Sequence, residues 1–545
     1  MNNDKRIELV KSEDGKQLVT KIFSIFQSFF KTKYSKNRIQ SFTPTNDLEE
    51  IKKRFDFIEE CINLPYEDID IKEIELPWHS VKNICFLTSD YENYRKLIEI
   101  YKGFPIFYVE SNRDLSISVD YLQVRSDNWD IVNLIPHAVY TKEPFPEFHI
   151  ERLVKVKELL LQIKDYLSEE LKNKIELLSK FSFEFPNARE EVINEIEIAN
   201  KELTEEIKSE RFEGETILNL LQGTVRDKLR DLINKKIEKI ENNLIKKGIT
   251  LDLSFIEPKI PLDINETLFS KSISEFESKL MLEYFEKVNE LFNIIGNSDE
   301  FLEKVKSEIY ELDFRLGIKK IVKFFNLKKP EFTNKGFSFS DGKNIFLLYK
   351  GINVEPVNYD VDVDGILLTG ANSGGKTSLL ELIFQIHFLA SIGFYVPANS
   401  KISLYDEIYY FSKPTGKTDS GAFETLLKKF SKINSSKKKL ILADEIEAIT
   451  EPGAAAKIIV GIMNWFIERN SLIIIVTHLA EDIAKYANSK IRIDGIQAIG
   501  ILDNKLVVNR SPLKGVLAKS TPELILQKLK SQGEFFNFLY DCLKK

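Results

Sequence analysis

Hydrophobic positions divide the chain into helical and strand-like stretches. Between residues 147 and 335, apolar residues recur three or four positions apart, which is the spacing of a coiled-coil seam. The pattern is carried by three runs, Leu153–Leu167, Val192–Ile207 and Val225–Leu244. Pro186 interrupts it, and a further helical run from Ser272 to Phe325 is broken near Gly296. We therefore predict a long helical lever and arm region in this part of the chain.

The N-terminal part combines helices with a small α/β unit at about residues 80–140. Ile84–Thr88 and Phe104–Val109 are short apolar runs of the kind that form strands. Between them, Ser89 and Glu92 have the spacing of a capping box, which predicts a helix start at this point. No residue of this unit indicates a particular chemistry.

Strand and helix patterns alternate from residue 336 to residue 515, as expected for a parallel-sheet nucleotide-binding domain. The last segment reads as two short helices, whose phenylalanines can pack internally or against a second subunit. We therefore expect a multi-domain protein of α/β and α parts. Its expected divisions are residues 1–146, 147–335, 336–515 and 516–545.

Composition restricts the class of protein without identifying it. The chain is 43% hydrophobic and 30% charged, which is typical of folded globular proteins, and its net charge of −7 gives no sign of a generally basic protein. The three cysteines are scattered, so a reduced cytoplasm is expected. The N-terminus lacks a signal-peptide pattern, and no apolar run approaches the roughly 18 residues that span a bilayer. We expect a cytoplasmic protein without a membrane partner.

The most specific motif is a glycine-rich turn between an apolar run and a helical pattern. It fits the P-loop pattern G-x-x-x-x-G-K-[ST]. In such a turn, small residues let backbone N–H groups converge on phosphate oxygens, and the helix N-terminus adds its dipole. Lys376 is placed to reach the β- and γ-phosphates, and the Thr377 hydroxyl to bind Mg²⁺. The expected nucleotide-binding residues are Gly370, Ala371, Asn372, Ser373, Gly374, Gly375, Lys376, Thr377 and Ser378.

Three further motifs follow the P-loop. The apolar run Lys439–Asp444 is followed by Glu445, which is the Walker B arrangement: Asp444 would hold Mg²⁺ and Glu445 would polarise the attacking water. The next apolar run ends at His478, which in this order becomes a sensor of the γ-phosphate. Ser420 and Gly421, at the start of a predicted helix, fit the segment that caps the γ-phosphate of an opposite subunit in ABC-type ATPases.

These residues resemble a known family. The P-loop Gly370-Ala-Asn372-Ser-Gly-Gly-Lys-Thr is similar to that of MutS-type ATPases, G-x-N-x-G-G-K-[ST], and the segment Ile392–Ala398 resembles the Ile-Gly-x-x-Val-Pro-Ala run that follows it there. The resemblance covers about residues 340–490. After Walker B the sequence looks more like an archaeal MutS-related branch. The N-terminal mismatch-reading domain of mismatch-repair MutS is not recognisable.

The resemblance implies an ATPase that uses ATP and Mg²⁺ in a homodimer with shared sites, and that works on DNA in repair or recombination. The catalytic residues would be Lys376, Glu445 and His478. The adenine-stacking aromatic of the family falls near Val354–Tyr359, where Tyr359 is available. Branched or recombining DNA is the expected substrate rather than mismatches, and association of the cytoplasmic protein with the nucleoid is left open.

A lysine cluster near the end of the third helical run leaves two interpretations open. It is either a solvated helix face interleaved with glutamate or a contact to the DNA backbone. Its members are Lys235, Lys236, Lys239, Lys246 and Lys247. The alternative to a DNA clamp is an ABC-type mechanical ATPase that acts on a ribonucleoprotein or protein partner, for which an apolar arm tip is expected. An SMC-type coiled-coil ATPase is a third possibility, but the arms are short for it.

Overall fold

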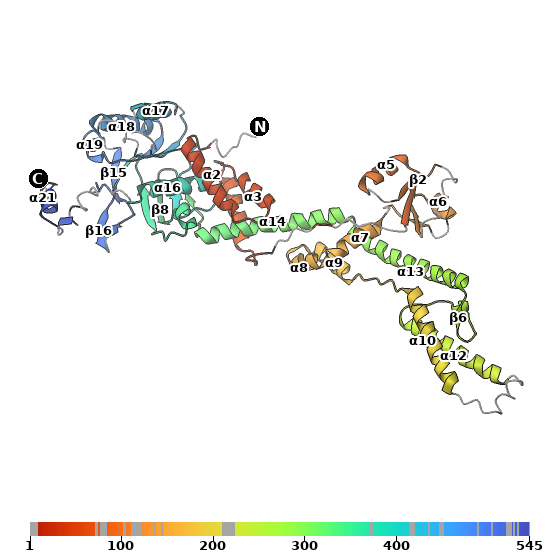
Figure 1. Cartoon of the computed structure of the whole chain (residues 1–545). Coiled ribbons are helices and arrows are strands. Elements are labelled where there is room, and N and C mark those ends of the chain that lie inside the picture. Colours follow the sequence, from red (N-terminus) through yellow and green to blue (C-terminus); the bar gives the residue numbers. More distant parts are fainter. Residues whose placement is uncertain are drawn as a thin grey trace. The chain divides into compact units, whose positions relative to one another are not determined.

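The computed structural model divides the chain into two compact units. One contains Met1–Ile71 and Ile309–Lys545, the other Lys72–Glu308. Helix α14 (Ser298–Phe325) contains the division between them (Figure 1). The described residues are 9–70, 75–76, 84–101, 105–110, 123–135, 138–142, 145–209, 224–370, 374–413, 420–433, 436–445, 452–487, 490–502, 505–518, 526, 529–530 and 533–543.

The first unit is built on a six-stranded sheet with the order β12-β13-β14-β10-β15-β18. Its first five strands run parallel, and β18 pairs antiparallel with β15. The strands are β10 (Gly365–Gly370), β12 (Glu407–Phe411), β13 (Lys439–Asp444), β14 (Ser471–Val476), β15 (Ile491–Ile496) and β18 (Leu513–Lys514). Strands β13 and β14 are buried along their whole length, because a parallel sheet is covered on both faces.

Alternate residues of β10 face two different hydrophobic cores, as the two-residue repeat of a strand requires. Ile366 and Leu368 pack in the core that contains Leu380 of α16, whereas Leu367 packs in the core that contains Met463 of α18. The helices of this unit after residue 340 are α15 (Ile345–Tyr349), α16 (Lys376–Ser391), α17 (Ser420–Ser431), α18 (Pro452–Ile467), α19 (Ala480–Ala484) and α21 (Glu534–Leu543).

Two smaller sheets accompany the main one. A four-stranded sheet has the order β7-β11-β8-β9, and β16 forms a hairpin with β17. Their strands are β7 (Glu331–Phe332), β8 (Phe337–Gly342), β9 (Val357–Val361), β11 (Asn399–Ile402), β16 (Ala498–Leu502) and β17 (Lys505–Val508). The alternation of strands and helices predicted for residues 336–515 is therefore present in this unit.

The N-terminal helices belong to the first unit rather than to a separate domain of residues 1–146. The ring of Phe26 lies 5.2 Å from that of Phe394, and the carboxylate of Asp313 accepts hydrogen bonds from the backbone N–H groups of Lys31 and Thr32 at 3.1 and 2.9 Å. Gly317 leaves no space for a Cβ, because the ring of Phe30 would lie 2.2 Å away. The helices are α2 (Glu13–Gln27), α3 (Lys33–Arg38), η1 (Ile39–Ser41) and α4 (Leu48–Ile62).

The second unit contains a small parallel sheet, in the stretch where the sequence predicts a small α/β unit. Its order is β2-β1-β3-β4. The elements are β1 (Ile84–Thr88), α5 (Tyr91–Ile100), β2 (Ile106–Tyr108), β3 (Gln123–Ser126), α6 (Trp129–Leu134) and β4 (Val139–Tyr140). The predicted capping box is wrong, because Asp90 caps α5 by accepting from the N–H groups of Glu92 and Asn93. Ser89 precedes this cap.

The rest of the second unit is mainly helical. The run Leu153–Leu167 is divided into short helices, because the backbone of Val156 leaves the helical region at φ −106° and ψ 6°. The break expected near Gly296 is present, with φ +84° at that glycine. The elements are α7 (Pro146–Lys155), α8 (Lys157–Ile163), η3 (Lys164–Tyr166), α9 (Glu169–Lys180), α10 (Ala188–Ser209), α12 (Thr224–Lys246), η4 (Leu253–Phe255), β5 (Ile256–Glu257), β6 (Asp263–Ile264) and α13 (Glu266–Ile295).

Within the described residues of both units, no helix combines the length and the apolar character that crossing a membrane requires.

Candidate nucleotide-binding site

The glycine-rich turn joins the central strand β10 to α16. Gly370 ends β10 with φ +150°, and a Cβ at this position would lie 2.8 Å from the carbonyl oxygen of Ile496. Gly375 precedes α16 in the left-handed region, with φ +93°. Only glycine adopts both conformations without strain, so the local backbone requires these two residues. Ala371, Asn372 and Ser373 lie outside the described residues.

Lys376 and Thr377 form the first turn of α16 and connect it to the end of β13. The buried Lys376 ammonium donates to the carbonyl oxygen of Gly370 at 3.0 Å and lies 3.9 Å from Oε1 of Glu445. The Thr377 hydroxyl donates to Oδ2 of Asp444 at 2.5 Å. The two predicted Mg²⁺ ligands, Thr377 and Asp444, are therefore in direct contact.

The Asp444 carboxylate fits the role of a metal ligand. It is 2% exposed, and its Oδ1 has no hydrogen-bond partner among the described residues. Burial raises the pKa of this carboxyl above its usual value, although the hydrogen bond from Thr377 acts in the opposite direction. A buried carboxylate oxygen without a partner is costly, and a bound cation would remove this cost. Hydroxyl and carboxylate oxygens are the ligands that Mg²⁺ prefers.

Glu445 lies directly after β13. Its backbone φ is +46°, a positive value that is rare for residues other than glycine. Its Oε1 accepts from Nε2 of His478 at 2.9 Å, and its Oε2 pairs with the ammonium of Lys413. Burial by itself would raise the pKa of Glu445, but the hydrogen bonds from Lys413 and His478 outweigh burial and hold this pKa below its usual value. The carboxylate is therefore ionised at neutral pH.

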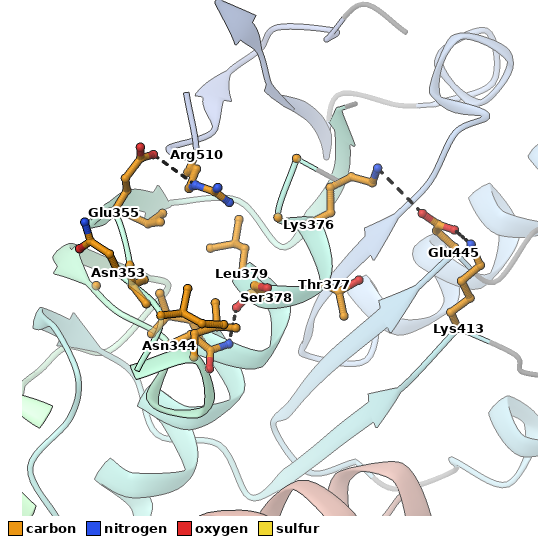
Figure 2. Close-up of a pocket in the computed structure, with 18 residues that line it drawn as sticks. Asn344, Asn353, Glu355, Lys376, Thr377, Ser378, Leu379, Lys413, Glu445 and Arg510 are labelled. Atoms are coloured by element: carbon orange, nitrogen blue, oxygen red, sulfur yellow. Dashed lines mark hydrogen bonds and ion pairs between the residues drawn. The ribbon is translucent and has the colours of Figure 1, made fainter. Parts of the chain in front are cut away.

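A cavity of about 530 Å³ runs from these residues along the first turn of α16 (Figure 2). At one end lie Lys376, Thr377, Lys413 and Glu445, which suit phosphates and a cation. The other end is partly apolar and is completed by Arg510. The remaining lining residues are Gly342, Asn344, Leu347, Ile352, Asn353, Val354, Glu355, Val357, Gly374, Gly375, Ser378, Leu379 and Leu382. This is a size and a chemistry that suit a small polar ligand with one apolar part.

Polar contacts fix the cavity wall that lies away from Glu445 and Lys413 (Figure 2). Asn344 donates to the carbonyl oxygen of Ser378 at 3.0 Å and to Oε2 of Glu381 at 2.9 Å, so the segment before α15 is attached to α16. Arg510 donates from Nε to Oε2 of Glu355 at 3.2 Å. No motif in the sequence points to Lys413, Asn344, Glu355 or Arg510, because each lies in a loop or at a helix start outside the P-loop and Walker B motifs.

Tyr359 does not fit the adenine-stacking role that the resemblance implies. Its side chain is 3% exposed, and its hydroxyl donates to Oδ2 of Asp494 at 2.8 Å. The residue does not line the cavity around the P-loop. The ring is thus part of the protein interior.

Ser420 and Gly421 are the first two residues of α17, as the sequence predicts for a helix start. Their contacts lie outside what the structure describes. Their expected role on the nucleotide of a second subunit therefore stays a prediction.

The lysine cluster near the end of the third helical run is largely paired with α10. The ammonium of Lys236, which is 8% exposed, lies 2.8 Å from Glu202 and 2.6 Å from Glu206. Lys239 also pairs with Glu202, and Lys247 pairs with Glu191 and Glu195. Lys235 and Lys246 are exposed. This arrangement favours the interpretation of a glutamate-interleaved helix face over that of a DNA contact.

A P-loop between a central parallel strand and a helix, with an acidic pair at the end of β13, which one strand separates from β10, defines a P-loop nucleotide-binding protein. A family model described as MutS domain V matches residues 366–521. The chain is 32% identical to the DNA-binding protein MutS2 of Pyrococcus furiosus, over 98% of this chain and 99% of that protein. The chain therefore belongs to the MutS-related family that includes this protein.

More distant relatives are longer than this chain. It is 24% identical to endonuclease MutS2 of Lactobacillus acidophilus over 59% of this chain and 42% of the relative. It is also 24% identical to endonuclease MutS2 of Clostridium botulinum strain Langeland, over 64% of this chain and 48% of the relative. The match thus spans less than half of each of these two relatives.

Proposed function

We propose that this protein hydrolyses ATP with Mg²⁺ at the cavity around α16. The observation that carries the proposal is the contact between Thr377 and Asp444, with Lys376 and Glu445 beside it. When bound, Mg²⁺ would neutralise the β- and γ-phosphates. Thr377 and Asp444 would hold the metal, and Lys376 the β- and γ-phosphates. Glu445 would orient the attacking water, and His478 would hold the Glu445 carboxylate and sense the γ-phosphate.

We further propose that the active form is a homodimer with two composite sites. Ser420 and Gly421 start a helix of twelve residues, and a helix N-terminus with a hydroxyl beside it suits the γ-phosphate bound by the other subunit. ATP binding would then close the dimer, and hydrolysis would reopen it. Sedimentation of the E445Q variant tests this step: dimers should accumulate with ATP. A monomer in every nucleotide state would contradict the proposal.

DNA is the proposed partner, with branched or recombining DNA favoured over mismatches. Support comes from membership of a family with a relative named as a DNA-binding protein. The paired lysines on α12 do not supply the basic patch that a clamp tip would need. This pairing keeps open the second candidate, a mechanical ATPase that acts on a ribonucleoprotein or protein partner.

One experiment separates these functions. ATP turnover by the full chain is measured alone and with linear duplex, mismatched duplex, four-way junction or RNA, with K376A as the inactive control. A rate that rises most with the junction supports action on branched DNA. Equal rates with every nucleic acid leave the ATPase in place and favour a protein or ribonucleoprotein partner. Turnover by K376A equal to that of the wild type would contradict the ATPase assignment.

A further inference from the structure

Lys413 is a cation in the cavity that no sequence motif identifies. It follows β12, and its ammonium pairs with Oε2 of Glu445. The other oxygen of that carboxylate accepts from His478 at 2.9 Å and lies 3.9 Å from the ammonium of Lys376. Figure 2 shows Lys376 and Lys413 on the two sides of Glu445. Both oxygens of the proposed water-orienting carboxylate therefore already have partners.

The contact with Lys413 competes with the proposed role of Glu445 in hydrolysis. A carboxylate orients a water molecule by accepting its hydrogen bond, which requires an oxygen lone pair directed at the water. The ammonium of Lys413 occupies Oε2, and His478 occupies Oε1. Each oxygen can accept a second hydrogen bond, but the ammonium of Lys413 on Oε2 lowers the pKa of Glu445 and so weakens its action on a water beside a bound γ-phosphate.

The burial of the two side chains indicates which one moves. The Glu445 side chain is 13% exposed, and its backbone N–H donates to the carbonyl oxygen of Val476 at 3.0 Å. The side chain of Lys413 is 59% exposed and ends a flexible four-carbon stem. Glu445 is thus held by the sheet, whereas Lys413 can swing without disturbing the core.

We infer that Lys413 exchanges partners during the ATP cycle. It holds the Glu445 carboxylate while the site contains no ATP, and it moves to the γ-phosphate when ATP enters. The ammonium of Lys413 is separated from that of Lys376 by a single carboxylate group, so the terminal phosphate that Lys376 binds comes within its reach. The exchange leaves Oε2 to the water, and it makes the position of the Lys413 side chain depend on whether a γ-phosphate is bound. The inference rests on the proposed ATP hydrolysis.

The test compares nucleotides with and without the γ-phosphate. Equilibrium binding of fluorescent ADP and of a non-hydrolysable ATP analogue is measured for the full-length wild type, K413Q and K413R. We expect K413Q to bind the ATP analogue about tenfold more weakly, which is the size of one charge-assisted hydrogen bond, with ADP affinity unchanged. K413R should keep most of the preference for the ATP analogue. A matched control is K401Q, which removes another exposed lysine, paired with Glu331 on β7 and away from the cavity.

A double variant tests the exchange itself. In E445Q the resting partner of Lys413 loses its charge, so the ATP analogue should bind more tightly than to the wild type, and adding K413Q should abolish this gain. Additive effects of the two substitutions would overturn the exchange. Equal weakening of ADP and ATP analogue in K413Q, or no change in either, would overturn the role of Lys413 while the proposed function stands. A wild type that binds neither nucleotide would overturn both.

Discussion

The hydroxyl of Thr377 and the carboxylate of Asp444 are in direct hydrogen-bond contact at 2.5 Å, although 66 residues separate them in the sequence. The contact exists because β10 and β13 both pair with β14, so that the carboxyl ends of the strands lie along one edge of the sheet. The first turn of α16 begins at that edge.

The first prediction concerns this contact. T377V removes the hydroxyl but keeps the side-chain shape, so the proposed Mg²⁺ site loses one ligand. We expect ATP turnover to fall at least tenfold and the dependence on Mg²⁺ concentration to shift upward. Turnover is measured across a Mg²⁺ titration, with T377S as the control that restores the hydroxyl. A T377V curve identical to the wild-type curve would rule out the hydroxyl as a ligand.

The second prediction concerns the far end of the cavity. Arg510 lies there beside Glu355 and approaches Gly375, where a Cβ would lie 3.2 Å from its Nη1. R510Q should weaken ADP and the ATP analogue to the same extent, by about tenfold, because both nucleotides share the parts that would lie here. Equilibrium binding checks this. A loss confined to the ATP analogue would instead place Arg510 near the γ-phosphate.

The third prediction separates structural from nucleic-acid roles of the α12 lysines. K236M breaks the pairs with Glu202 and Glu206, so we expect it to lower the free energy of unfolding by about 1 kcal/mol without changing the salt dependence of DNA binding. K235M alters an exposed neighbour and is expected to leave stability unchanged. Thermal unfolding and filter binding at several salt concentrations measure both. If DNA binding by K236M depended less on salt concentration than DNA binding by the wild type, this result would support a contact between Lys236 and the DNA backbone.

The fourth prediction is a pH dependence from His149. Its Nδ1 accepts the backbone N–H of Ser298 at 3.3 Å, so the neutral ring carries its hydrogen on Nε2, which lies 2.9 Å from the Tyr101 hydroxyl. Burial lowers the pKa of His149 to about 4, with a smaller opposing effect from Asp299 and a further lowering by Arg152. Since the folded-state pKa lies below the unfolded value near 6.5, the unfolded chain binds the extra proton first.

The contribution of His149 to stability is therefore complete above pH 6.5 and is lost as the pH falls towards 4, by about 3 kcal/mol at most. Urea unfolding at several pH values measures it, and H149Q removes the titrating group. The buried His387, whose pKa burial lowers to about 3, stays in both proteins, so the difference between the two curves isolates His149. Parallel curves for H149Q and the wild type would contradict the prediction.

Much of the local structure could be predicted from the sequence. The apolar runs before Thr377 and Glu445 are strands, Ser420 starts a helix, and Gly296 separates two long helices. These features depend on neighbours in the chain, such as hydrophobic spacing and glycine conformation. Such local prediction also fails in places. The sequence predicts that Ser89 caps α5, but the adjacent Asp90 has a carboxylate that can fill the same role and is the residue that caps the helix.

The sequence by itself determined the nucleotide-binding motif, since the geometry of a P-loop depends on a short run of consecutive residues. The tertiary structure decided that residues 1–71 pack with that motif's domain, that Tyr359 is buried against Asp494, and that the ammonium of Lys236 pairs with α10. It also brought Lys413, Arg510 and Glu355 to the cavity. These outcomes depend on which distant surfaces meet and on how deeply a side chain is then buried. Periodicity and spacing along the chain do not contain that information.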